Sequence, residues 1–137
     1  MSRYVLDSTV LIECEGAVEP TSARVKALLA AHHELCVCAV VLAEFYSGAP
    51  RGTNPRMDAF LSRLSYIDLT PDMAATAGSF RHQARAKRRR LATPDSLIAA
   101  LGHHLSATIL TNNVRDFEVT GVAVERLGGT GNVMAAR

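Results

Sequence analysis

Short apolar runs alternate with longer segments of helical periodicity along this chain of 137 residues. The runs at residues 3–6, 35–40, 66–69, 108–111 and 122–127 have the length and composition of buried strands. Strands that alternate with helices form parallel sheets covered by helices on both faces. The sequence therefore predicts an α/β fold with a mainly parallel central sheet.

Helices are expected to fill the intervals between these strands. We predict them at residues 8–13, 21–33, 41–47 and 55–64, followed by a long helix that opens at Thr70 and another from Thr93 to about Ser106. The last two open on Thr-Pro-Asp, which supplies a threonine cap, a proline in the first turn and an acid. Residues 1–127 are predicted to form one domain, and the glycine-rich segment 128–137 a flexible tail.

Composition excludes several classes of protein. With 48% hydrophobic and 20% charged residues, the chain has the composition of a folded globular domain. No apolar run approaches the roughly 20 residues of a membrane helix, and no signal-peptide pattern opens the chain, so we expect a cytoplasmic protein without membrane contact. The spacing of Cys14, Cys36 and Cys38 fits neither a zinc site nor a disulfide framework, which predicts reduced thiols in the core.

Four acidic residues stand where apolar runs end: Asp7, Glu44, Asp95 and Asp116. Asp7 directly follows the first strand, and Asp116 lies just beyond the fourth. In open α/β sheets the ligand site lies beyond the carboxyl ends of the strands, where the strand order reverses. Four carboxylates gathered there would repel one another and favour a hard divalent cation such as Mg²⁺ or Mn²⁺.

Each acid also has a purely structural interpretation. Asp7 could cap the helix that follows it, Asp95 could complement a helix dipole, and Asp116 could belong to a turn. Glu44 is harder to explain, because its apolar neighbours predict buried surroundings in which a lone glutamate needs a partner. We favour a shared site, since the structural interpretation requires four coincidences at one edge of the sheet.

The four segments, in this order and at these spacings, resemble the PIN-domain ribonucleases, and most of all the VapC-type toxins of bacterial toxin–antitoxin pairs. The matching stretches are residues 4–12, 40–45, 95–100 and 110–117, and the resemblance covers nearly the whole chain. It implies a PIN-like α/β/α sandwich with an acidic pocket that holds Mg²⁺ or Mn²⁺. It also implies an RNA substrate, a cognate antitoxin protein and a homodimer.

The chemistry of phosphodiester hydrolysis assigns a role to each acid. Asp7, Asp95 and Asp116 are the expected metal ligands, and Glu44 would bind the cation through water or orient the attacking water. Because water is the nucleophile, the products should carry a 5′-phosphate and a 3′-hydroxyl. By resemblance, two further residues are expected to shape the pocket, Thr111 and Asn112.

A basic run precedes Asp95, although the formal net charge of the chain is only +2. It consists of Arg85, Lys87, Arg88, Arg89 and Arg90. Such a run is either a solvated helix end or an electrostatic footprint for phosphates. Both interpretations stay open, and the run is the candidate RNA-binding segment.

Two other functions compete with that of a ribonuclease. A phosphatase resembling the haloacid-dehalogenase group would use Asp7 as its nucleophile, but Thr9 stands where that group has a second aspartate. A catalytically silent RNA-binding or partner-binding domain would share the fold without the chemistry. The four carboxylates argue against it, because they would repel a phosphate ligand.

Overall fold

The computed structural model describes residues 1–128. The strands are β1 (Arg3–Leu6), β2 (Glu34–Val37), β3 (Ser65–Tyr66), β4 (Thr108–Leu110) and β5 (Val124–Glu125). They form one sheet in the order β3-β2-β1-β4-β5, and every neighbouring pair is parallel. The strand order reverses at β1, which has β2 on one side and β4 on the other. The predicted parallel sheet is confirmed.

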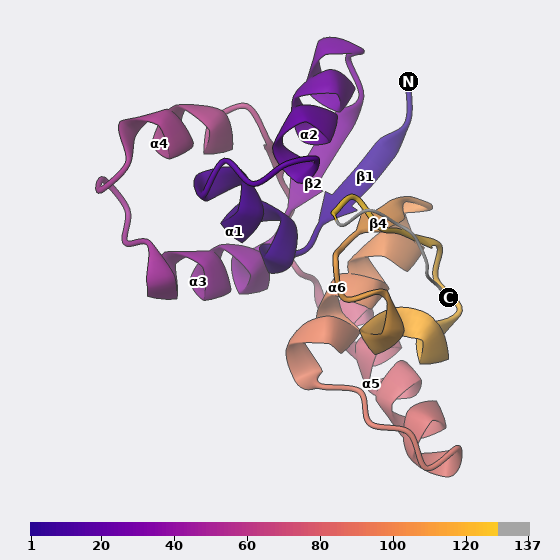
Figure 1. Ribbon diagram of the computed structural model, residues 1–137. Helices are drawn as coiled ribbons and strands as arrows, with labels where there is room; N and C mark the ends of the chain where they lie inside the picture. The colour runs from indigo at the N-terminus through magenta and orange to yellow at the C-terminus, as the bar shows by residue number, and fades with distance from the viewer. Residues whose placement is uncertain (129–137) are drawn as a thin grey trace.

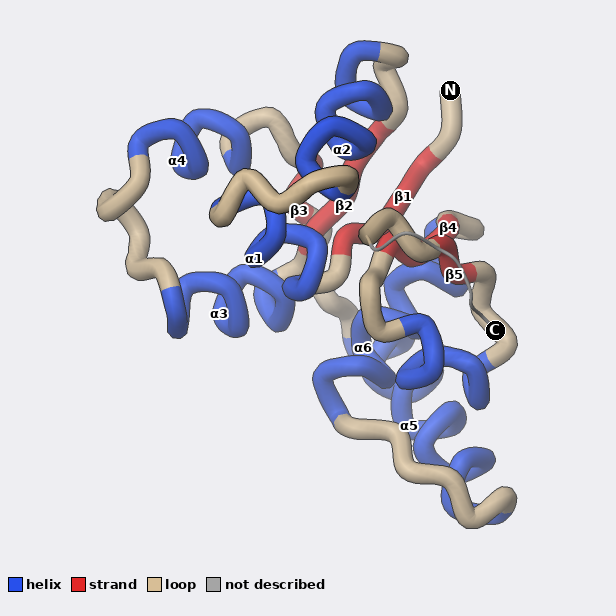
Figure 2. The backbone as a smooth tube through the Cα atoms, viewed as in Figure 1, coloured by secondary structure: helices blue, strands red, loops and turns tan. Residues whose placement is uncertain are grey.

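Helices connect these strands and cover both faces of the sheet. They are α1 (Ser8–Glu15), α2 (Thr21–Ala30), α3 (Ala39–Gly48), α4 (Pro55–Leu61), α5 (Pro71–Ala86), α6 (Thr93–Leu105) and the 3₁₀-helix η1 (Val114–Thr120). In Figures 1 and 2, α1 to α4 lie on one side of strands β1 and β2, whereas α5 and α6 lie on the other side. Covering both faces hides the apolar strands from water, which gives the α/β/α sandwich predicted from the sequence.

The core is centred on the middle of the sheet. Val5 and Leu6 of β1 and Ile109 of β4 have no exposed surface. On the face covered by α6, a Cβ at Gly102 would lie 3.1 Å from Cγ1 of Ile109, so glycine allows this helix to pack closely on β4. The three cysteines are free and buried, as predicted.

Helix α5 begins as predicted, whereas α6 does not. The side chain of Thr70 accepts a hydrogen bond from the backbone N–H of Met73 at 3.2 Å and caps α5. In α6 the N-cap is Ala92, which makes no side-chain cap, and Thr93 already lies inside the first turn. The prediction of a threonine cap for α6 was therefore wrong. Pro94 lacks an N–H, which leaves this first turn with one donor fewer to satisfy.

Several predicted boundaries differ from the observed ones. Strand β2 ends at Val37 rather than at residue 40, because α3 already begins at Ala39. Helix α2 ends at Ala30, and His32 turns the chain with a φ of 64°. Strands β3 and β5 are shorter than predicted. The 3₁₀-helix η1 occupies a segment for which we predicted neither a helix nor a strand.

The predicted tail begins one residue too early. Gly128 is buried, and its backbone N–H donates a hydrogen bond to Oδ1 of Asn112 at 2.6 Å. A Cβ at this position would lie 2.8 Å from the same oxygen, so the contact requires glycine. The rest of the predicted tail, residues 129–137, lies outside the described residues. Within residues 1–128, the helices are too short or too polar to span a lipid bilayer.

Candidate active site

Four different elements carry the four predicted acids. Asp7 is the N-cap of α1, Glu44 lies in the middle of α3, Asp95 lies in the first turn of α6, and Asp116 lies in the first turn of η1. Helices α1 and α3 and the 3₁₀-helix η1 follow β1, β2 and β4 in the chain, so they begin at the carboxyl edge of the sheet. This edge is where the strand order reverses, at β1.

The electrostatics of Asp95 indicate that the other three acids lie near enough to act on its carboxylate. The pKa of Asp95 is raised from 3.8 to about 6, first by burial and then by the negative charges of Asp7, Asp116 and Glu44. Within residues 1–128, none of the four acids forms an ion pair with a basic side chain. The described part of the chain therefore leaves the negative charge of this site uncompensated.

Asp7 is the most deeply buried of the four acids, with 4% of its surface exposed. Its Oδ1 accepts a hydrogen bond from the backbone N–H of Ser8 at 2.8 Å. Its Oδ2 accepts from the hydroxyls of Thr111 at 2.7 Å and Thr9 at 3.2 Å. Asp7 is thus both the helix cap of the structural interpretation and a fixed member of the acidic site.

Thr111 and Asn112 lie next to this carboxylate at the end of β4. Thr111 is fully buried, and besides donating to Asp7 it accepts from the N–H of Asn113 at 2.9 Å. The backbone N–H of Asn112 donates to the hydroxyl of Thr9 at 3.1 Å. The amide nitrogen Nδ2 of Asn112 is buried and has no hydrogen-bond partner in the described part of the chain. Both residues therefore tie the fourth strand to the start of α1.

The surroundings of Glu44 differ from the prediction. Val41 and Phe45 form the buried face of α3, whereas Glu44 is exposed. The expectation that Glu44 lies in a buried run was therefore wrong, because the helix is buried on one face only. An exposed carboxylate needs no ion-pair partner. Thr9 is a site residue that sequence reasoning missed, although a hydroxyl two positions after Asp7 was the available signal.

The chemistry of the donors fits a hydrated hard cation. Carboxylate and hydroxyl oxygens are the ligands that Mg²⁺ and Mn²⁺ prefer. Within residues 1–128, no group of three or more His, Cys, Asp or Glu side chains is arranged to enclose a metal ion. Mg²⁺ keeps several waters and is commonly held by one or two carboxylates, so a closed cage of protein ligands is not required.

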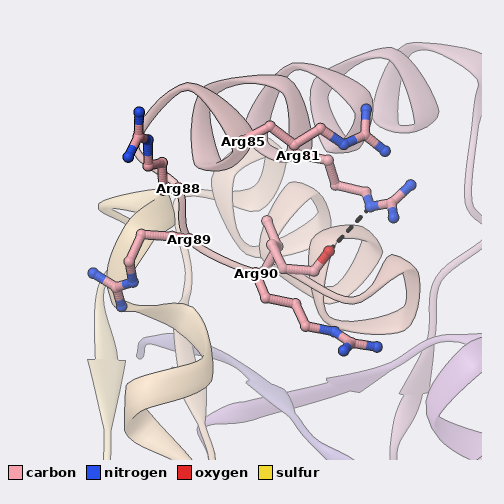
Figure 3. Close-up of a pocket in the computed structure, with 6 residues that line it drawn as sticks. Arg81, Arg85, Arg88, Arg89 and Arg90 are labelled. Atoms are coloured by element: carbon pink, nitrogen blue, oxygen red, sulfur yellow. Dashed lines mark hydrogen bonds between the residues drawn. The ribbon is translucent and has the colours of Figure 1, made fainter.

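The predicted basic segment surrounds a hollow of about 290 Å³ (Figure 3). Its lining consists of Arg81, Arg85, Arg88, Arg89, Arg90 and Leu91. Lys87, which we also predicted to bind RNA, is not among the lining residues. Arg81 was missed by sequence reasoning, although its spacing of four residues from Arg85 places the two on one helix face.

Fold and site together define an α/β/α protein with an acidic, oxygen-rich site at the point where the strand order of a parallel sheet reverses. Comparison with known families shows to which of them the chain belongs. Residues 4–122 match the family model described as the PIN domain. The chain therefore belongs to the PIN-domain family, which confirms the resemblance drawn from its sequence.

Individual relatives agree with this assignment. The chain is 27% identical over 120 residues to ribonuclease VapC2 of Rickettsia felis, covering 84% of this chain and 90% of that protein. It is 30% identical over 90 residues to ribonuclease VapC2 of Haemophilus influenzae, covering 62% and 68%. The crystal structure of VapBC2 from Rickettsia felis bound to a promoter DNA fragment superposes with a TM-score of 0.78 at 25% identity, covering 90% of this chain and 98% of that chain.

Proposed function

We propose that this protein is a metal-dependent endoribonuclease and the toxin component of a type II toxin–antitoxin pair. The observation that carries the proposal is the group of four carboxylates, which raise the pKa of one member and are not paired with basic side chains within residues 1–128. Such a site favours a divalent cation, which would offset the repulsion between the carboxylates and an RNA phosphate. The ribonuclease names of the relatives support the same activity.

In this proposal Asp7, Asp95 and Asp116 hold the cation, directly or through the waters that the ion keeps. A bound Mg²⁺ or Mn²⁺ ion would relieve the charge on the non-bridging phosphate oxygens and lower the pKa of a bound water. The hydroxyl of Thr111 fixes the orientation of the Asp7 carboxylate. Asp95, with a pKa of about 6, is ionised at neutral pH. Glu44 is exposed, and in this proposal it binds the cation through water or orients the attacking water.

Water is the nucleophile in this reaction. The water loses a proton as its oxygen forms the new bond to phosphorus, the bond from phosphorus to the ribose 3′-oxygen breaks, and the leaving oxygen takes up a proton. Cleavage therefore leaves a 5′-phosphate and a 3′-hydroxyl. The ribose 2′-hydroxyl takes no part in bond breaking, so cyclic phosphate ends should not form.

A cognate antitoxin, a homodimer and a cytoplasmic location belong to the same proposal. The antitoxin would block the site by placing a basic side chain among the four carboxylates and apolar side chains over residues 44–46. Membership of the PIN family and the likeness to a VapBC complex support this partner.

The geometry of Asp7 counts against a phosphatase that would use it as a nucleophile. Both of its carboxylate oxygens accept hydrogen bonds, and the residue is only 4% exposed. Thr9, at the position where the haloacid-dehalogenase group has a second aspartate, donates to Asp7 instead. A hydrogen-bonded, buried carboxylate is poorly placed to attack phosphorus.

The activity is tested by incubating the protein with RNA, with DNA and with a phosphatase substrate, each in Mg²⁺ and in EDTA. We expect cleavage of RNA that is lost in EDTA. The substitutions Asp7→Asn and Asp95→Asn should each lower the cleavage rate by about two orders of magnitude or more, because each removes a charge that holds the cation.

Asp72→Asn is the matched control. Asp72 also lies in the first turn of a helix that opens on Thr-Pro-Asp, but it is exposed and is not among the charges that raise the pKa of Asp95. This variant should cut RNA at the rate of the wild-type protein. Full activity in EDTA, or in both site variants, would contradict the proposal.

A further inference from the structure

We propose that Arg81, Arg85 and Arg90 form a binding face for the backbone phosphates of RNA beside the acidic site. This inference rests on the proposed ribonuclease function and identifies the surface that holds the substrate there. We call these three residues the phosphate face. They contribute to the hollow of about 290 Å³ at the end of α5.

The three arginines come from one helix and the loop that follows it. Arg81 and Arg85 lie one turn apart near the end of α5, and Arg90 follows in the loop before α6. Figure 3 shows their guanidinium groups on one side of the loop and those of Arg88 and Arg89 on the opposite side. Guanidinium groups match the geometry of phosphate oxygens with paired N–H donors, so three of them on one side suit a phosphodiester backbone.

Arg81 is held in position before any ligand arrives. Its Nε donates a hydrogen bond to the backbone carbonyl of Leu91 at 3.0 Å, drawn as the dashed line in Figure 3. Leu91 is only 5% exposed and anchors the loop in the protein interior. Because this guanidinium group is already oriented, less side-chain entropy is lost when an anion binds.

The positive charge of the phosphate face is not neutralised within residues 1–128. The one ion pair that the lining arginines form there joins Arg89 to Glu118 at 3.8 Å, and Arg89 lies on the opposite side of the loop. No carboxylate is among the described residues that line the hollow. These arginines therefore remain available to an external anion.

The phosphate face lies close to the acidic site along the chain. Asp95 follows Arg90 by five residues, so the Cα atoms of these two residues are at most about 18 Å apart. An RNA strand bound at Arg90 can therefore reach the acidic site within a few nucleotides. Their positive charge offsets the repulsion between the strand and the four carboxylates.

The lining of the hollow suits the RNA backbone rather than the bases. Among the described residues it includes no aromatic side chain on which a base could stack and no side-chain hydrogen-bond acceptor. Arginine only donates, and its charge interacts with every phosphate alike. The phosphate face therefore binds RNA irrespective of sequence, and any preference for a cleavage site arises elsewhere on the molecule.

The test compares two double variants that remove the same charge from opposite sides of the loop. Binding is measured in EDTA, where no hydrolysis occurs, with a fluorescent single-stranded RNA of mixed sequence. Arg85→Gln combined with Arg90→Gln should weaken binding roughly 10- to 30-fold at 0.1 M salt and flatten the slope of log affinity against log salt by about 1.4. Arg88→Gln combined with Arg89→Gln should have a much smaller effect.

Arg81 stays unchanged in both variants, because its hydrogen bond to Leu91 holds the loop. The substituted side chains are exposed, so the melting temperatures should match that of the wild type. The variant Arg85→Gln/Arg90→Gln should lose affinity equally for poly(A) and for poly(U). An uncharged methylphosphonate strand should bind weakly to the wild type and to both double variants. Equal losses in the two double variants, or an unchanged affinity and salt slope in the first, would overturn the inference.

Cleavage kinetics in Mg²⁺ separate this inference from the proposed function. The variant Arg85→Gln/Arg90→Gln should raise KM while kcat stays near the wild-type value, because the phosphate face binds the strand without touching the reacting phosphate. A wild-type protein that binds RNA through these arginines but cuts none would refute the ribonuclease and leave the phosphate face standing. Normal cleavage by the variant with no change in KM would refute the phosphate face and leave the ribonuclease standing.

Discussion

The raised pKa of Asp95 reflects the loss of stability that comes with assembling the acidic site. Its pKa is about 6 in the folded protein, raised first by burial and then by three neighbouring negative charges, against an ordinary value of 3.8. Between these two values the folded protein binds more protons at Asp95 than the unfolded chain does. The contribution of Asp95 to stability therefore falls as the pH rises through this window and stays low above it.

This linkage predicts a pH-dependent difference between two proteins. In EDTA, the free energy of unfolding of Asp95→Asn should increase relative to that of the wild type as the pH rises from about 4 to about 6. Above that pH the difference should stay constant. Urea denaturation at stepped pH values measures it. The exposed control Asp72→Asn should show no such increase relative to the wild type. A difference that is constant across the window would contradict the account of Asp95.

Single residues of the site differ in how far the sequence predicts them. Asp7 was predictable as a helix cap because it directly follows a buried strand, although its hydrogen bond from Thr111 depends on a residue 104 positions later. Thr9 lies two positions after Asp7, a local signal that was overlooked, whereas its contact with Thr111, 102 residues later, exists only in the folded sheet. The exposure of Glu44 was not predictable, because it depends on which face of α3 packs inward.

At the level of elements, α5 ends in a Schellman motif that has an arginine where glycine is usual. Arg88 has a φ of 55°, and its N–H donates to the carbonyl of Arg85 at 2.9 Å. The N–H of Arg89 donates to the carbonyl of Ala84 at 2.8 Å, which completes the motif. A side chain in the left-handed region costs about 1–2 kcal/mol relative to glycine.

Arg88→Gly should therefore stabilise the protein. We expect a net gain of about 0.5–1 kcal/mol, since glycine also increases the entropy of the unfolded chain. RNA binding should change little, because Arg88 lies opposite the phosphate face. Ser106→Gly, at the left-handed C-cap of α6 with a φ of 51°, relieves the same strain without a change of charge. Urea denaturation of both variants tests the prediction, and a loss of stability in both would refute it.

Long elements were predicted better from the sequence than short ones. Helices α5 and α6 show their period over several turns, and both open on Thr-Pro-Asp. Strands β3 and β5 have two residues each, and their ends are set by pairing with β2 and β4. Such pairing joins distant segments and leaves no local signal. The 3₁₀-helix η1 opens with the same residue types as a turn, so the two could not be distinguished.

At the scale of the whole molecule, binding of a cation should stabilise the fold. A ligand that binds only the folded state adds about 1.4 kcal/mol at a tenfold excess over its Kd, which corresponds to a few degrees in Tm for a domain of this size. Calorimetry in millimolar Mg²⁺ or Mn²⁺ and in EDTA measures the shift. Equal Tm values in both conditions would count against a shared metal site.

Asp116→Asn is the informative variant for this measurement. Asp116 is exposed, so the substitution removes a repelling charge from the site without burying an unsatisfied group. Its Tm in EDTA should exceed that of the wild type, and the shift caused by the cation should shrink. A variant that melts below the wild type in EDTA would contradict mutual repulsion of the carboxylates.

On the ribosome, the first strand of this sheet is made long before one of its two neighbours. Strand β1 pairs with both β2 and β4, and Asp7 receives the hydroxyl of Thr111 only after the end of β4 has been translated. Asp116 emerges later still. A nascent chain that stops before residue 108 holds Asp7, Glu44 and Asp95 but has no fourth strand beside β1. An enzyme that cuts RNA should therefore lack a finished site while the codons for its first hundred or so residues are being read.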